Sequence, residues 1–170
     1  MTRRPFPEPT DSRESRTEVF IGYLDYFRAA LVDKLRGIPE EELRSSRLPS
    51  GWSPIALLKH LTNVERRWLV WRFGGEHVGR PWPEWSRGRW YVPDDETLDE
   101  LVSSLHEQAG RSDAIIRAHE LSDTGSAGDA WDGEEPASLE RILFHLVQEY
   151  ARHLGHLDIV RELIDGEVGE

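Results

Sequence analysis

Apolar residues recur at intervals of three and four along four long stretches of the chain. This spacing puts side chains on one face of an α-helix, so it predicts helices over residues 14–35, 53–73, 97–120 and 138–165. Ser53 and Pro54 favour the start of the second helix. No strand pattern accompanies these stretches, so the predicted fold class is all-α, a four-helix bundle.

A long connection, residues 76–95, lies between the second and third predicted helices and is rich in tryptophan, tyrosine and proline. A stretch with so many aromatic residues is expected to be an ordered loop. Two interpretations remain open: the aromatic residues cover the end of the core, or the loop is a lid that forms one wall of a pocket.

The last predicted helix places ionisable side chains within an otherwise apolar stripe. A helix normally turns such a stripe toward the core, where a glutamate is rare unless it is paired or binds a metal. A buried hydrogen-bonded network, or a stripe partly exposed at the end of the bundle, would also account for the pattern. Helical spacing puts these residues on the stripe: Ile142, Leu146, Glu149, His153, His156 and Val160.

We favour metal binding because a third ligand is available in the second predicted helix. His60 lies on the core-facing stripe of that helix, and alone it would be interpreted as a buried, hydrogen-bonded histidine. With Glu149 and His153 it completes a set of two imidazoles and one carboxylate. Such a set suits zinc, nickel, manganese or iron(II) and leaves a coordination position free for catalysis. His145 and His156 lie close to this pair on the last helix and are candidates for orienting a ligand or contacting a substrate.

Length, charge and composition indicate a single domain and exclude several classes of function. The chain has 170 residues, enough for one domain, which we place at residues 14–170 after a flexible N-terminal arm at residues 1–13. The net charge of −11 argues against nucleic acid as a partner. Neither a membrane span nor a signal core is apparent, so a cytoplasmic location is expected. The sequence has no cysteine, so any thiol used in a reaction has to come from a cosubstrate.

Two segments carry a resemblance to a known family. Residues 51–68 contain Gly-Trp-Ser-Pro followed by Leu-Lys-His-Leu-x-x-Val-Glu-x-x-Trp. Residues 145–162 are His-Leu-x-x-Glu-Tyr-Ala-Arg-His-Leu-Gly-His-Leu-Asp-Ile-x-Arg-Glu. These segments resemble the DinB superfamily (DinB/YfiT-like metalloenzymes), and within it an actinobacterial branch of unknown function. The resemblance covers most of the chain and implies a four-helix bundle with an up, down, down, up arrangement, a divalent metal at one end and often a homodimer.

The resemblance also implies a ligand set. In that family one ligand comes from the second helix and two, four residues apart, come from the last, which implies His60, Glu149 and His153. Many relatives have three histidines, so Glu149 departs from the commonest pattern. The set is similar to the His-Glu-His set of the mycothiol-dependent maleylpyruvate isomerase, whose metal is zinc. Characterised members use low-molecular-weight thiols such as mycothiol or bacillithiol as cosubstrates.

The leading hypothesis is a metal-dependent S-transferase or isomerase that uses a mycothiol-like thiol. In this reaction a metal-activated thiolate attacks an electrophilic small molecule. Metal-assisted hydrolysis by a bound hydroxide is an alternative enzymatic function. A non-catalytic, stress-related bundle that binds a metal is an alternative of another class.

Overall fold

The computed structural model of the protein describes residues 6–86 and 88–169. Its long helices are α1 (Arg16–Arg36), α3 (Pro54–Glu65), α4 (Leu98–Arg117) and α5 (Leu139–Asp165), and α3 continues directly into a π-helix, η1 (Arg66–Phe73). Shorter elements are α2 (Glu40–Arg44), the 3-10 helix η2 (Asp129–Trp131) and two antiparallel strands, β1 (Trp85–Ser86) and β2 (Arg89–Trp90). The predicted all-α class is confirmed, with one small hairpin inside the aromatic segment.

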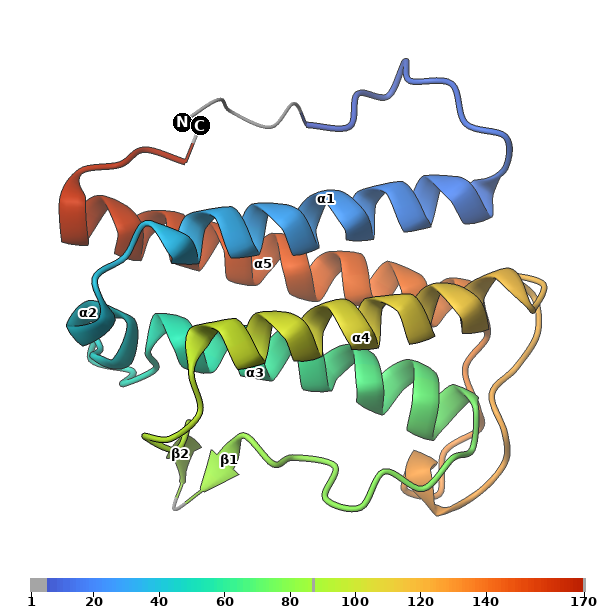
Figure 1. Cartoon of the computed structure of the whole chain (residues 1–170). Helices are drawn as coiled ribbons and strands as arrows, with labels where there is room; N and C mark the ends of the chain where they lie inside the picture. Colours follow the sequence, from blue (N-terminus) through green and yellow to red (C-terminus); the bar gives the residue numbers. More distant parts are fainter. Residues whose placement is uncertain (1–5, 87, 170) are drawn as a thin grey trace.

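The long helices lie side by side (Figure 1). α1 and α5 run in one direction, and α3 and α4 run in the opposite direction. α1 packs mainly against α5, while α3 packs against both α4 and α5. The chain between η1 and α4 returns along the outer side of α3 and carries the hairpin, so a loop residue can reach side chains of α3.

Side-chain caps stand at the start of α1, α4 and α5. Ser15, Thr97 and Ser138 each accept a hydrogen bond from a backbone amide in the first turn of their helix. Ser53 occupies the same position before α3, and Pro54 follows it as predicted, but the Ser53 side chain makes no capping hydrogen bond. The second long helix therefore starts where the sequence predicts, although no side-chain hydrogen bond of Ser53 caps it.

The buried face of α5 differs from the predicted stripe. Glu149, His153 and His156 are only partly buried, so they lie beside the core-facing stripe and not within it. The prediction that these side chains point into the core was wrong because Tyr150, the next residue along the helix, fills the core instead. The buried residues of α5 are Leu139, Ile142, Leu143, Leu146, Tyr150, Leu154, Leu157, Val160 and Arg161.

The predicted N-terminal arm falls partly outside the described residues, which begin at Phe6. The part that the structure describes contacts α1. The ring centre of Phe6 lies 4.8 Å from that of Tyr26, and the hydroxyl of Tyr23 donates a hydrogen bond of 3.4 Å to the carbonyl oxygen of Pro7. These contacts place residues 6 and 7 against the outer side of the first helix.

A buried polar network joins the long helices around Glu65, whose side chain has no exposed surface. Glu65 accepts two hydrogen bonds from the guanidinium of Arg28, at 2.8 and 2.9 Å. It accepts two more, each of 2.6 Å, from the hydroxyls of Ser112 and Tyr150. Burial raises the pKa of Tyr150 well above its usual value, so this hydroxyl keeps the proton that it donates. The network therefore links α3 to α1, α4 and α5 through a single carboxylate.

We expect Glu65→Ala to lower the free energy of unfolding by about 3–5 kcal/mol, because it leaves the Arg28 guanidinium buried without its main partner. Urea denaturation followed by circular dichroism measures this change. Glu107→Ala is the matched control: Glu107 is exposed on α4, and its removal should change the free energy by no more than about 0.5 kcal/mol. Equal effects of the two substitutions would contradict the central place of Glu65 in the network.

Candidate metal centre

α3 and α5 bring the three predicted ligands together. His60, Glu149 and His153 each offer a donor atom, and these atoms lie within 4.8 Å of one another. Nε2 of His153 lies 3.3 Å from Oε2 of Glu149, and Nε2 of His60 lies 3.9 Å from the same oxygen. Glu149 and His153 are one helical turn apart, so both side chains leave α5 toward α3. Two imidazoles and a carboxylate at this spacing could hold a metal ion.

The two further candidates on α5 differ in what they contact. Nε2 of His145 lies 3.4 Å from Oε1 of Glu149, and the His145 ring packs against Trp68 with the ring centres 4.7 Å apart. His156 meets the ring of His153, with 5.7 Å between the two ring centres. The structure thus places His145 against the carboxylate of a candidate ligand, whereas His156 lies beside the imidazole of another.

The charge of Glu149 is favoured by the imidazoles around it. His153 and His60 lower the pKa of the Glu149 carboxyl far below its usual range, although partial burial acts in the opposite direction. Burial lowers the pKa of His145 despite the attraction of Glu149, and the nearby Arg72 acts in the same direction as burial. Glu149 is therefore ionised and His145 neutral near pH 7, which are the states in which such groups bind metals or orient metal ligands.

His60 lies between two carboxylates. Its Nδ1 faces Oε1 of Glu84 at 3.3 Å, and its Nε2 faces Glu149. The ring of Trp90 stacks on the His60 ring, with centres 4.2 Å apart and planes within 16° of parallel. Burial lowers the pKa of His60, but the two carboxylates outweigh this effect and the net shift is upward. The surroundings of this imidazole thus favour a positive charge.

The aromatic segment supplies a residue that the sequence analysis did not identify. Glu84 is 1% exposed and accepts a hydrogen bond of 2.6 Å from Nη1 of Arg67, which lies in η1. Trp82 and Trp85, on either side, are both 49% exposed, so they do not serve as a cover for the core. Trp90 packs both on His60 and against the hydrophobic core, so this part of the loop covers the core and also lies against the candidate centre.

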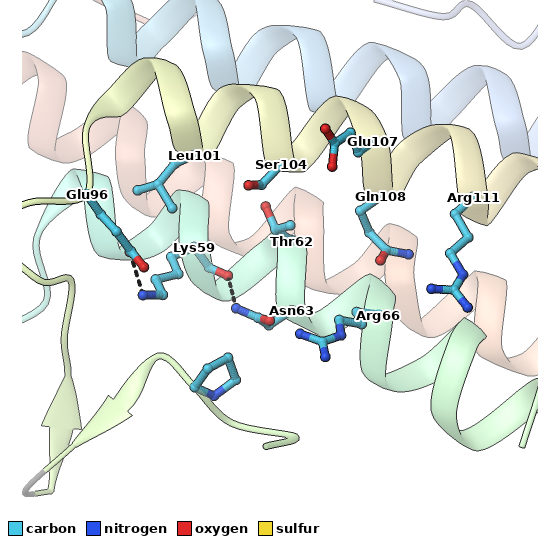
Figure 2. Close-up of a pocket in the computed structure, with 11 residues that line it drawn as sticks. Lys59, Thr62, Asn63, Arg66, Glu96, Leu101, Ser104, Glu107, Gln108 and Arg111 are labelled. Carbon is cyan, nitrogen blue, oxygen red and sulfur yellow. Dashed lines mark hydrogen bonds and ion pairs between the residues drawn. The ribbon is translucent and has the colours of Figure 1, made fainter. Parts of the chain in front are cut away.

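A separate pocket lies between α3 and α4 (Figure 2). Its volume is about 440 Å³, and none of the three candidate ligands lines it. Lys59 pairs there with Glu96 at 2.5 Å, and the amide of Asn63 donates to the backbone oxygen of Lys59. Gln108 donates in turn to the hydroxyl of Ser112. Because these polar groups already have partners within the protein, we place the candidate site on the α5 side of α3.

The all-α fold and the cluster of two histidines and a glutamate are consistent with the DinB-like superfamily, to which the matching sequence family belongs. Within that class the sequence matches the mycothiol-S-transferase family over residues 19–166, and the chain belongs to this family. The resemblance that the sequence motifs indicated is confirmed.

None of the curated proteins compared with the chain matches it. Within residues 6–86 and 88–169, no helix is both long and apolar enough to cross a membrane.

Proposed function

We propose that the protein is a metal-dependent transferase that joins a low-molecular-weight thiol of the mycothiol type to an electrophilic small molecule. Membership of the mycothiol-S-transferase family supports the thiol and the transfer reaction. The observation that supports the metal is the gathering of three donor atoms within 4.8 Å of one another, with 3.3 Å between Nε2 of His153 and Oε2 of Glu149. Two ligands of one tetrahedral zinc ion, with bonds of about 2.0–2.2 Å, lie about 3.4 Å apart, so small movements of these side chains would bring all three donors to one ion.

The proton on His60 supports the same interpretation. Carboxylates face both of its ring nitrogens and raise the pKa of His60, so the site favours a positive charge there. A metal ion at Nε2 would supply that charge in place of the second ring proton, while Nδ1–H donates to Glu84. Nε2 of His153, 3.3 Å from the same Glu149 oxygen, offers a third donor. The residues present therefore fit a divalent metal ion.

Residues of the chain would hold the metal ion and orient one of its ligands. A divalent metal held by His60, Glu149 and His153 would supply a Lewis acid that lowers the pKa of a thiol toward neutrality. The reacting thiol has to enter from solution, since the chain contains no cysteine. His145, 3.4 Å from Oε1 of Glu149, holds the second oxygen of that carboxylate and so fixes its orientation.

Tryptophan side chains surround the candidate ligands. Trp90 packs on both His60 and His153, and Trp68 packs on His145. Indole rings at these positions cover part of the cluster, while the side chains of Glu149 and His145 stay 26% and 37% exposed.

Metal content tests the ligand set. We expect about one divalent ion per chain, most readily zinc, in purified wild-type protein, and little or none in Glu149→Ala and His153→Ala, since each variant loses one of three ligands. His106→Ala is the matched control because His106 is exposed on α4 and should leave the metal content unchanged. Elemental analysis of untagged protein gives the result. Wild-type protein that takes up no metal, or variants that retain it, would overturn the proposed ligands.

Thiol consumption tests the reaction. With mycothiol and a panel of electrophiles, the metal-loaded protein should form conjugates, and removal of the metal by a chelator should abolish nearly all of this activity. Readdition of zinc to the chelated protein should restore it. Turnover that proceeds without any thiol would instead indicate metal-assisted hydrolysis. Loss of stability on chelation, with no reaction under any condition, would indicate a non-catalytic metal-binding protein.

A further inference from the structure

Glu84 is buried in a segment whose neighbouring side chains are exposed. Its exposed fraction is 1%, against 49% for Trp82 and Trp85. A glutamate is rarely buried so completely unless it is paired, because removing a carboxylate from water is costly. The position of Glu84 therefore needs an explanation in terms of its partners.

The partners of Glu84 connect the loop to the candidate metal centre. Oε1 accepts a hydrogen bond of 2.6 Å from Arg67 and faces Nδ1 of His60 at 3.3 Å. Oε2 is buried and, within the described part of the chain, has no hydrogen-bond partner. One face of the His60 ring is covered by Trp90. The imidazole is thus held at one ring edge by a carboxylate and on one face by an indole.

We propose that Glu84 is a positioning residue of the metal centre, whose carboxylate accepts a hydrogen bond from Nδ1–H of His60 and so presents Nε2 to the metal. The inference rests on the metal centre proposed above. Carboxylates that hold the second nitrogen of a metal-binding histidine fix its tautomer and ring orientation and make it a stronger ligand. Arg67 keeps the Glu84 carboxylate in place, so the guanidinium, the carboxylate and the imidazole form one chain of contacts leading to the ligand atom.

A simpler role for Glu84 would be to fasten the loop to α3, and the structure offers a control for that role. A second contact also joins this connection to α3: Glu96 pairs with Lys59 at 2.5 Å beside α4 (Figure 2). Lys59 is the residue directly before His60. Glu84 and Glu96 are therefore two loop carboxylates bound to consecutive residues of one helix, and only the first contacts a candidate ligand.

Zinc affinity separates the two roles. We expect Glu84→Gln, which keeps the size of the side chain and removes its charge, to weaken zinc binding by about 10–100-fold. Glu96→Gln should bind zinc with the same affinity as the wild-type protein. Competition with a chromophoric zinc chelator measures the dissociation constants, and circular dichroism of the metal-free proteins checks that each variant is folded.

The proton on His60 gives a second test that needs no variant. In zinc-loaded wild-type protein, nitrogen-15 NMR of the imidazole should show a hydrogen attached to Nδ1 of His60 and protected from exchange. A His60 ring without that hydrogen would overturn the inference, whether or not Glu84→Gln folds.

The outcomes of the affinity series are distinct. Weaker binding in Glu84→Gln together with normal binding in Glu96→Gln supports the positioning role. Equal loss in both variants would show that fastening the loop is what matters, and an unchanged affinity in Glu84→Gln would also overturn the inference while leaving the metal centre intact. Failure of the wild-type protein to bind zinc would overturn the metal centre itself, and this inference with it.

Discussion

The buried carboxylate of Glu65 is the interaction on which the arrangement of the long helices depends. A buried charge is tolerated only where hydrogen bonds satisfy it, and the donors here come from α1, α4 and α5. A shift of any of these helices by one turn would remove at least one of the hydrogen bonds that satisfy the charge. His60 lies on the same helix as Glu65, and Glu149 directly precedes Tyr150 on α5. The hydrogen bond from Tyr150 to Glu65 therefore also fixes the spacing of the two helices that carry the candidate ligands.

The sequence predicts correctly those features that produce a regular pattern of residues within one segment of the chain. The last helix was predicted over residues 138–165 and is observed as Leu139–Asp165, because apolar spacing, an N-cap serine and a following glycine all mark it. Its ionisable residues stood out against the same spacing. Their orientation was misjudged because a period of three and four residues cannot tell Glu149 from Tyr150 as the residue that faces the core. That choice depends on what the neighbouring helices offer, and Glu65 offers a partner to the tyrosine.

The features that were missed depend on contacts between distant parts of the chain. Glu65 could have been found, since it continues the buried spacing of Leu58 and Leu61 and is an ionisable residue in an apolar stripe. Glu84 could not, because its partners lie 17 and 24 residues away and a loop has no periodicity. The π-helix after α3 could not be predicted from a pattern with 3.6 residues per turn. It carries Arg67, which donates a hydrogen bond to Glu84. Wider helical turns of this kind are frequent at functional sites.

The two polar clusters of the protein differ in a way that bears on their roles. Around Glu65 the donors and the carboxylate satisfy one another, as expected of a network that holds helices together. Around His60 the balance is different: the imidazole lies between the carboxylates of Glu84 and Glu149, and one Glu84 oxygen has no partner among the described residues. Two carboxylates that face one imidazole favour a cation there, which is either a second proton on the ring or a bound metal ion. This contrast, more than the number of histidines, supports the metal centre proposed above.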